Sequence, residues 1–214
     1  MKHIVWDWNG TLLNDLELVV AATNASLATA GTGPTTVDEH RRDFFRPVQA
    51  YYGKMVGREL SEEEFAELDR AFHRAYKAGL ADLSLAPDAL TSLQAWPGSQ
   101  SLLSMWFHRE LVPTVARYGL TRYFARVDGL RAAIGGGSKA PHLAAHLGEL
   151  RLAGADVVLI GDSLDDAAAA ASVGANCVLY SGGLTHPDAL VRAGVPVADS
   201  LTEALTLATT FSGV

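Results

Sequence analysis

Short apolar segments alternate with longer amphipathic segments along most of the chain. Five of the short segments have the length and composition of buried strands, and Gly, Asp or Ser bounds several of them. They are residues 3–6, 101–103, 126–130, 157–160 and 176–180. The stretches between the last four are long enough for crossover helices. The pattern therefore predicts an α/β fold with a Rossmann-like parallel sheet.

The interval between the first two predicted strands has helical periodicity instead. Apolar residues recur there at helical spacing, and Ser61 and Glu64 have the spacing of a capping box, which opens a helix. Four helices are predicted in this interval, over residues 15–30, 36–45, 48–56 and 61–77. The simplest organisation is a helical cap over residues 15–84, inserted into an α/β core formed by residues 1–14 and 85–214.

Composition and charge narrow the class of protein. Hydrophobic residues make up 49% of the 214 residues, enough for a sizeable core, and only 19% of residues are charged, which is not typical of long disorder. The formal net charge of −7 predicts no nucleic-acid or anionic-membrane partner. Asp7 interrupts the apolar start that a signal peptide needs, and no run reaches the length of a membrane span. The single cysteine, Cys177, fits a reducing compartment, so we expect a soluble, cytoplasmic protein.

Acidic residues follow two of the predicted strands. Asp7 comes directly after the first strand, Asp162 follows the fourth, and Asp165 and Asp166 begin the next helix. Ligands of open α/β sheets bind outside the carboxyl ends of the strands. Carboxylates gathered there are hard oxygen ligands suited to Mg²⁺. Taken singly, Asp7, Asp165 and Asp166 are also explained as helix caps or partners of the helix dipole. That explanation fits Asp162 less well, because Asp162 precedes the helix by several residues.

Two other segments resemble ligand-binding motifs, but neither indicates a binding site by itself. The run of glycines at 135–137 leads to Ser138 and Lys139, but Ser138 stands where a Walker phosphate loop needs Gly. Lys139 alone would be a solvated surface lysine. His142 and His146 are one helical turn apart, with no third ligand at useful spacing, so we predict a surface helix face rather than a metal pair.

Four segments in order resemble the motifs of the haloacid dehalogenase superfamily. They are the loop Asp7-Trp8-Asn9-Gly10-Thr11-Leu12, the strand end Leu102-Leu103-Ser104, the segment Ser138-Lys139-Ala140-Pro141 and the segment Gly161-Asp162-Ser163-Leu164-Asp165-Asp166. With the helical insert after the first motif, the resemblance covers essentially the whole chain. The nearest subgroup is that of the small-capped phosphoglycolate phosphatases and β-phosphoglucomutases. The resemblance implies that the Asp7 strand lies between the strands of Ser104 and Asp162.

The resemblance also implies a nucleophile and a metal site. Asp7 would be the nucleophile that takes a phosphoryl group from the substrate. Mg²⁺ would be bound by the Asp7 side chain, the backbone carbonyl of Asn9 and the Asp162 side chain. Asp166 would support the metal or orient Lys139.

Further residues would hold the substrate. The resemblance implies that Ser104 and Lys139 contact the phosphoryl oxygens, while Gly10 and Thr11 shape the loop. Such contacts suit phosphoryl transfer, because the transferred group carries spread negative charge that must be positioned and neutralised.

A basic cluster in the predicted cap is a candidate for substrate selection. It consists of Arg41, Arg42, Arg46 and Lys54. An arginine fork binds a carboxylate or a second phosphate well, so we predict Arg42 and Arg46 as substrate contacts. Each of these residues taken singly is better explained as ordinary surface charge.

The leading hypothesis is a Mg²⁺-dependent phosphatase that acts on a small phosphorylated metabolite through an aspartyl-phosphate. Asn9 departs from the family pattern, because phosphatases usually have Asp there to protonate the leaving oxygen, and an amide has no proton to give. Two alternatives stay open. One is a catalytically impaired member that binds a ligand or partner, and the other is a hydrolase of carbon–halogen or carbon–phosphorus bonds.

Overall fold

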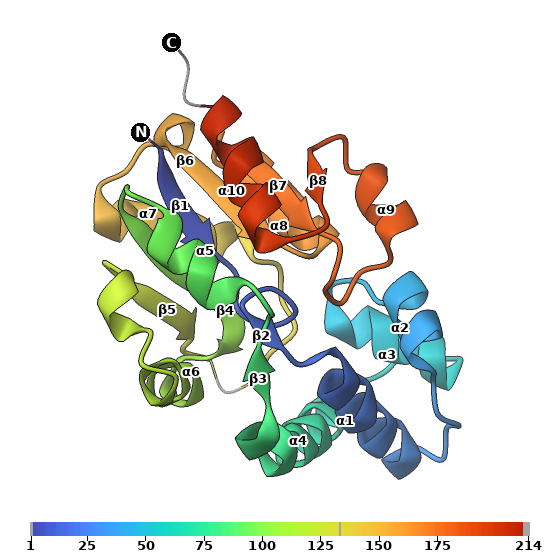
Figure 1. Ribbon diagram of the computed structural model, residues 1–214. Helices are drawn as coiled ribbons and strands as arrows, with labels where there is room; N and C mark the ends of the chain where they lie inside the picture. The colour runs from blue at the N-terminus through green and yellow to red at the C-terminus, as the bar shows by residue number, and fades with distance from the viewer. Residues whose placement is uncertain (1, 133, 212–214) are drawn as a thin grey trace.

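A six-stranded parallel sheet forms the centre of the molecule in the computed structural model, which describes residues 2–132 and 134–211 (Figure 1). The strands follow the order β5-β4-β1-β6-β7-β8. Their bounds are β1 (His3–Trp6), β4 (Gln100–Phe107), β5 (Val127–Leu130), β6 (Val157–Gly161), β7 (Asn176–Tyr180) and β8 (Val197–Ala198). The predicted α/β class is confirmed, and β1 lies between β4 and β6, as the resemblance implied.

Helices cover both faces of the sheet. Because successive strand residues point to opposite faces, Ile4 and Trp6 pack into one apolar cluster and Val5 into another. The first face is covered by α5 (Ala89–Ala95), α6 (His108–Arg117) and α10 (Leu201–Thr210). The second is covered by α7 (Ala140–Leu150), α8 (Leu164–Ser172) and α9 (Pro187–Val191). The part of the chain that the structure describes also contains three short 3₁₀ turns, η1 (Leu80–Asp82), η2 (Thr121–Tyr123) and η3 (Gly154–Asp156). Burial on both faces explains why the strands are nearly continuous apolar runs.

The four helices predicted between the first two core strands are present. They are α1 (Leu16–Thr29), α2 (Val37–Asp43), α3 (Val48–Val56) and α4 (Glu62–Gly79). They lie together at the side of the molecule away from the chain ends (Figure 1) and have their own apolar cluster around Tyr52 and Phe65. The capping box is confirmed, because Ser61 and Glu64 each accept a hydrogen bond from the other's backbone N–H. We call α1 to α4 the cap; its assignment to residues 15–84 as a separate unit stays a prediction.

Both connections between the cap and the sheet run side by side. β2 (Leu13–Asn14) pairs antiparallel with β3 (Ser84–Leu85), and the N–H of Ala86 donates to the carbonyl of Leu12 at 2.9 Å. This two-stranded β2–β3 ribbon leads directly from the Asp7 loop into α1. Two-residue strands have no periodicity of their own, which is why the sequence pattern did not predict them.

Strand β4 is longer than predicted. It continues past Leu103 to Phe107, and its register against β5 is irregular between these two residues. The expectation that Ser104 closes the strand is therefore wrong, since Ser104 lies inside it at the irregular segment. A local bulge changes the direction of the side chains around it, which places Ser104 and Met105 near the carboxyl end of β1.

The predicted exposed histidine face of α7 is wrong for His146. This side chain is only 1% exposed. Its Nδ1 lies 2.8 Å from the Asp128 carboxylate, and its Nε2 lies 2.8 Å from the Ser101 hydroxyl, which also meets Nε2 of His3 at 2.8 Å. His146 and His3 therefore belong to a buried hydrogen-bond network that is joined by the Ser101 hydroxyl, and His146 does not lie at the surface.

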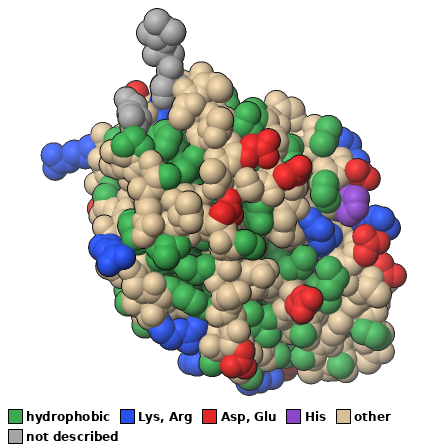
Figure 2. Space-filling model, viewed as in Figure 1, with side chains coloured by type: hydrophobic (Ala, Val, Ile, Leu, Met, Phe, Trp, Pro, Cys, Tyr) green, Lys and Arg blue, Asp and Glu red, His purple; other side chains and the backbone are tan. Residues whose placement is uncertain are grey.

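The surface has charges of both signs. On the face shown in Figure 2, Lys and Arg side chains lie interspersed with Asp and Glu side chains. Within residues 2–132 and 134–211, none of the helices combines the length and apolarity that crossing a membrane requires.

Candidate active site

Four charged side chains meet where β1 and β6 end. Lys139 Nζ lies 2.8 Å from Asp7 Oδ1 and also contacts Asp166 Oδ1. One carboxylate oxygen from each of Asp7, Asp162 and Asp166 lies within 4.8 Å of the other two. Because β1 and β6 are parallel neighbours, their carboxyl ends bring together acids that are about 155 positions apart in the sequence. The structure thus gathers the predicted nucleophile, cation and metal ligands.

This group contains three buried carboxylates but only one buried ammonium, that of Lys139. Burial raises the pKa of Asp7 to about 6, although Lys139 works against that shift. Burial and the charges of Asp7 and Asp166 raise the pKa of Asp162 well above its ordinary value. Burial alone would lower the pKa of Lys139, but Asp166 and Asp7 raise it above the usual range. Three buried carboxylates share one ammonium, so the residues fit a divalent cation with oxygen ligands.

The loop after β1 is shaped around Asp162. Gly10 has φ of +70°, and a Cβ there would lie 2.4 Å from Asp162 Oδ2, so only glycine fits. The Thr11 hydroxyl donates to Asp162 Oδ1 at 3.1 Å, and the backbone N–H of Leu184 donates to Oδ2 at 2.6 Å. The predicted loop-shaping role of Gly10 and Thr11 agrees with these contacts. The contribution of Leu184 was missed, although glycines at 182–183 after β7 were a signal of close backbone approach.

The start of α8 holds Lys139 in place. The N-cap of this helix is Ser163 and not Asp165 or Asp166. Asp166 is the third residue of the helix and forms a capping box with Ser163. The Asp166 carboxylate accepts from the Ser163 N–H at 3.0 Å and pairs with Lys139 at the same time. Asp165 accepts from the Lys139 backbone N–H at 2.9 Å and from the Ser138 hydroxyl at 3.1 Å. Lys139, only 2% exposed, is therefore a fixed cation rather than a solvated lysine.

Asn9 is held by hydrogen bonds on both sides of its amide. Its Nδ2 donates to Asp15 Oδ2 at 2.7 Å and to the Tyr76 hydroxyl oxygen at 2.8 Å, while its Oδ1 accepts from the Ser104 hydroxyl at 3.1 Å. Asp15 also accepts from the Gly10 N–H at 2.7 Å and from the Tyr76 hydroxyl at 2.7 Å. Burial raises the pKa of Asp15, and these hydrogen bonds counteract the rise. The amide donates to Asp15 and accepts from Ser104 at once, whereas a carboxylate at this position would bring two acids into contact.

Asp15 and Tyr76 were not among the predicted site residues. Asp15 follows the β2 strand and Tyr76 lies 61 positions later on α4, so no local pattern joins them. The only signal was an acid just before a helical stretch, which is more often a simple cap.

The comparisons with known proteins agree with this geometry. A sequence model of the haloacid dehalogenase-like hydrolases matches residues 1–174. The chain belongs to this family.

Two named enzymes are similar to this hydrolase. It is 26% identical over 176 residues to a phosphoglycolate phosphatase of Agrobacterium fabrum, covering 78% of this chain and 74% of that protein. It is 26% identical over 212 residues to phosphoglycolate phosphatase 1 of Pseudomonas aeruginosa, covering 92% and 73%.

Solved structures share the fold of the hydrolase. A predicted phosphatase from Clostridium acetobutylicum superposes with a TM-score of 0.82 at 16% identity, over 95% of each chain. A predicted phosphoglycolate phosphatase from Haemophilus somnus gives 0.76 at 20% identity, over 97% of this chain and 98% of that one. At these identities the likeness is one of fold alone.

The basic residues of the cap do not act as one cluster in the hydrolase. Arg46 reaches the site, where its Nε lies 3.6 Å from Asp165 Oδ2. Arg42 points away, with a side chain that is 60% exposed and paired with Asp38 at 2.8 Å. Lys54 pairs with Asp43, also at the surface. The structure therefore brings Arg46 to the other predicted site residues and does not bring Arg42 there.

Arg41 ties the cap to the core of the hydrolase. Its Nη2 donates to the carbonyl oxygens of Ser181 at 2.6 Å and Thr185 at 3.2 Å. Arg46 adds a hydrogen bond to the Gly137 carbonyl at 3.2 Å, and the Val48 N–H donates to the Gly136 carbonyl at 3.0 Å. These contacts hold the cap over the carboxyl ends of the strands.

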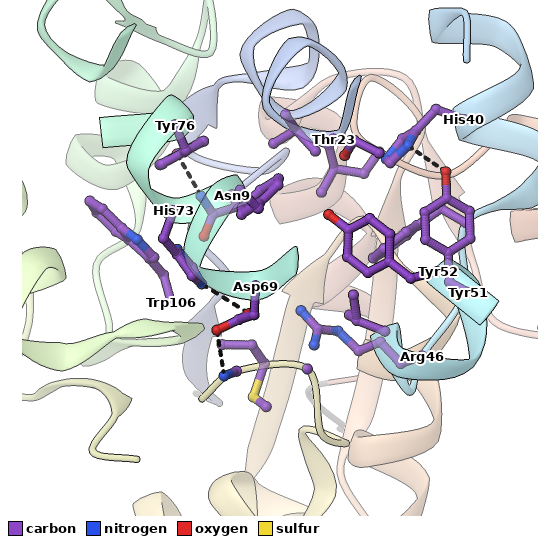
Figure 3. Close-up of a pocket in the computed structure, with 18 residues that line it drawn as sticks. Asn9, Thr23, His40, Arg46, Tyr51, Tyr52, Asp69, His73, Tyr76 and Trp106 are labelled. Carbon is purple, nitrogen blue, oxygen red and sulfur yellow. Dashed lines mark hydrogen bonds and ion pairs between the residues drawn. The ribbon is translucent and has the colours of Figure 1, made fainter. Parts of the chain in front are cut away.

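Two cavities adjoin under the cap. The smaller, of about 40 Å³, lies at the charged group and includes Asp7, Lys139 and Asp162 in its wall. The larger, of about 110 Å³, extends between the cap helices and the sheet (Figure 3). Both are lined by the same five residues where they meet, namely Asn9, Phe44, Arg46, Met105 and Leu184.

Proposed function

We propose that this hydrolase is a phosphatase that removes the phosphoryl group from a small phosphorylated metabolite, with Asp7 as the nucleophile. The buried contact between Asp7 and Lys139 carries the proposal, since it sets a carboxylate nucleophile beside a fixed cation. The names of the two similar enzymes support the phosphatase class.

The proposed reaction has two displacements at phosphorus. A carboxylate oxygen of Asp7 attacks the phosphorus atom, the bond from phosphorus to the ester oxygen breaks, and its electron pair leaves on that oxygen. Water then attacks the phosphorus of the aspartyl-phosphate, and the bond from phosphorus to the Asp7 oxygen breaks. Inorganic phosphate leaves, the Asp7 carboxylate is restored, and the proton lost by the attacking water passes to the phosphate or to solvent. Covalent catalysis of this kind divides one difficult displacement into two easier ones. Lys139 and the Ser104 hydroxyl are the proposed partners of the phosphoryl oxygens.

Asp7, Asp162, Asp166 and the backbone carbonyl of Asn9 are the groups that would hold Mg²⁺. The ion would supply charge neutralisation, which lets a carboxylate approach an anionic phosphoryl group. The excess of buried negative charge in this group supports the assignment.

The proposed first displacement lacks a side-chain acid at position 9. The Asn9 amide has no proton to give, and its Nδ2 is already engaged with Asp15 and Tyr76. The leaving oxygen must therefore depart as a stable anion, or take a proton from water.

A phosphate-release screen tests the proposal. Purified protein with Mg²⁺ should hydrolyse at least one small phosphate ester or acyl phosphate, and a chelator should remove the activity. Asp7→Asn should abolish turnover while leaving the fold unchanged by circular dichroism, because an amide cannot attack phosphorus. Asp82→Asn, at an exposed acid in η1, is the matched control and should leave turnover unchanged.

Two results would contradict the proposal. Substantial turnover by pure Asp7→Asn protein would exclude Asp7 as the nucleophile. Halide release from a haloacid without metal, with no phosphate release from any ester, would assign the alternative carbon–halogen chemistry instead.

A further inference from the structure

The leaving group of the substrate must lie in the larger cavity. The smaller cavity contains Asp7 and Lys139, so the phosphoryl group belongs there. The two cavities join at Asn9, Phe44 and Met105. Whatever is bonded to the phosphoryl group therefore passes Asn9 and enters the space between Phe44 and Met105.

The wall of the larger cavity is mainly apolar and aromatic. Rings from both the cap and the core contribute to it, and several of them are shown in Figure 3. They are Phe44, Tyr51, Tyr52, Phe72, Tyr76 and Trp106. Phe44 stacks on His40 with centroids 5.1 Å apart and meets Tyr51 edge-on at 5.2 Å. Such walls bind flat, apolar groups through stacking and edge-to-face contacts.

The size of the cavity restricts the ligand to about one ring. Sites for drug-sized ligands usually measure about 300–1,000 Å³. The volume here, about 110 Å³, is far below that range. An apolar cavity of about 150 Å³ is known to hold benzene, so a single small ring is the right scale.

The charges around this cavity do not favour an anionic leaving group. Arg46 already faces Asp165 and donates to Gly137. Asp69, which lies 3.3 Å from His73, adds a carboxylate to the wall. Burial lowers the pKa of His40 to about 4, so this side chain is neutral at pH 7. A carboxylate on the leaving group, as in phosphoglycolate, would meet Asp69 and no unpaired cation among the described residues of the wall.

His40 is a buried and uncharged member of this wall. It is 1% exposed, and its Nδ1 lies 3.0 Å from the Tyr51 hydroxyl. Its Nε2 has no hydrogen-bond partner among the described residues. His40 therefore contributes no charge to this wall.

From these observations we propose that the natural substrate is an aryl phosphate monoester, in which the phosphoryl oxygen is bonded directly to a small neutral aromatic ring. The proposal rests on the phosphatase function proposed above and names its substrate class. The aromatic wall explains the ring, and Asn9 explains the direct bond. A phenolate leaves as a stable anion without a proton donor, whereas an alkoxide needs the acid that Asn9 lacks.

Four probes separate the ring from the leaving group. Phenyl phosphate has a ring and a good leaving group, benzyl phosphate has a ring and a poor one, acetyl phosphate has only the good leaving group, and 2-phosphoglycolate has neither. With saturating Mg²⁺, we expect KM for the two ring compounds to be about tenfold or more below that for the other two, because an apolar ring is buried. We expect kcat for phenyl phosphate to exceed that for benzyl phosphate by about 10²-fold.

Variants of Phe44 test whether the cavity wall contacts the ring of the substrate. Phe44 is partly exposed, so its truncation should be tolerated by the fold. Phe44→Ala should raise KM for phenyl phosphate about tenfold, and it should raise KM for acetyl phosphate much less, because acetyl phosphate has no ring to lose the contact. Phe44→Tyr keeps the aromatic ring, so it should raise KM for phenyl phosphate less than Phe44→Ala does. Phe45→Ala is the matched control, because Phe45 is 40% exposed and lines neither cavity.

The outcomes discriminate between the two levels of the proposal. A kcat/KM for 2-phosphoglycolate equal to or above that for phenyl phosphate would overturn the aryl substrate while confirming a phosphatase. Equal effects of Phe44→Ala on phenyl and acetyl phosphate would overturn the ring contact. Failure to hydrolyse any of the four, acetyl phosphate included, would refute the phosphatase function itself and the substrate class with it.

Discussion

At the scale of single residues, Asn9 connects the nucleophile loop to the cap. Its amide donates to Asp15 and Tyr76, and its carbonyl accepts from Ser104. Sequence comparison by motif describes Asn9 only as a lost acid. The structure shows that the amide also keeps a buried carboxylate, Asp15, from meeting a second one.

Replacing the amide by a carboxylate tests both descriptions. Asn9→Asp alone should lower the free energy of unfolding by about 1–3 kcal/mol, because it sets two buried carboxyl groups in contact. Adding Asp15→Asn exchanges the two side chains, and the double variant should recover most of that loss. It should also raise the ratio of benzyl to phenyl phosphate turnover by up to about 10²-fold, since an acid then faces the leaving oxygen.

Urea unfolding and paired rate measurements provide the two readouts. If the double variant is as unstable as Asn9→Asp, the Asn9–Asp15 contact is not the cause. If the ratio stays at the wild-type value, the missing acid is not what limits alkyl esters.

His3 gives a residue-scale prediction about pH. Its ring is buried between the Ser99 and Ser101 hydroxyls, and burial together with the nearby His146 lowers its pKa to about 4. The unfolded chain binds a proton near pH 6.5, but the folded protein does so only near pH 4. Stability from His3 is therefore complete above pH 6.5 and is lost as the pH falls toward 4.

Between pH 8 and pH 5.5 this single group should cost about 1.4 kcal/mol of unfolding free energy. Urea unfolding of the wild type and His3→Gln at both pH values measures it. The difference between the two pH values should be about 1.4 kcal/mol smaller in His3→Gln. Parallel losses in the two proteins would mean that His3 is protonated in the folded state.

At the scale of elements, periodic segments were predictable and short ones were not. β1, β7 and α3 have the predicted bounds, because a run of apolar residues or a helical stripe fixes each of them locally. β4 was cut short, since its polar Ser104 breaks the apolar pattern inside a bulge. The ribbon and β8 were missed because two residues carry no period.

The residues of the candidate site also differ in whether a local sequence pattern predicts them. Asp7 and Asp162 could be predicted from strand ends, where the topology of a parallel sheet determines what meets. The contacts of Asp15 with Tyr76, and of Arg41 with the loop after β7, depend on how the cap packs on the core. That packing joins distant residues through tertiary structure, and no local pattern encodes it.

Arg41 gives an element-scale prediction, because it joins α2 to the loop after β7. Arg41→Ala removes hydrogen bonds from a charged group to the carbonyls of Ser181 and Thr185, worth about 1.5–3 kcal/mol. The backbone amides of α2 should exchange hydrogen faster, and kcat/KM should fall roughly tenfold as the cap spends less time closed.

Arg42→Ala is the informative companion to this variant. Its side chain is 60% exposed and paired only at the surface, so we expect less than a twofold change in KM. A large rise in KM would restore Arg42 as a substrate contact. Unchanged hydrogen exchange in Arg41→Ala would mean that other contacts hold the cap.

At the scale of the whole molecule, the acidic group should link metal binding to stability. Three buried carboxylates repel one another in the metal-free fold, and Lys139 balances only part of their charge. Mg²⁺ at about 100 times its Kd should add about 2.7 kcal/mol to the free energy of unfolding. For a chain of this size that corresponds to a rise in Tm of roughly 5–10 °C.

Calorimetry with and without Mg²⁺ measures this effect without any substrate. Asp162→Asn should be insensitive to the ion, because it loses one proposed ligand and part of the repulsion. Equal Tm values for the wild type in Mg²⁺ and in a chelator would argue against a metal site at these carboxylates.

The closed cap also limits what the phosphoryl group can be attached to. A ring tethered to a polypeptide or a nucleic acid needs an exit for the polymer, whereas the space in which the ring would lie measures only about 110 Å³ and has Arg46 in its wall, bonded to the Gly137 carbonyl. Phosphorylated macromolecules that present the same aromatic group should therefore be left intact. The enzyme would hydrolyse free phosphorylated metabolites and would not hydrolyse phosphate bound to proteins. The small size of the cavity, and not recognition of any sequence, would exclude the larger substrates.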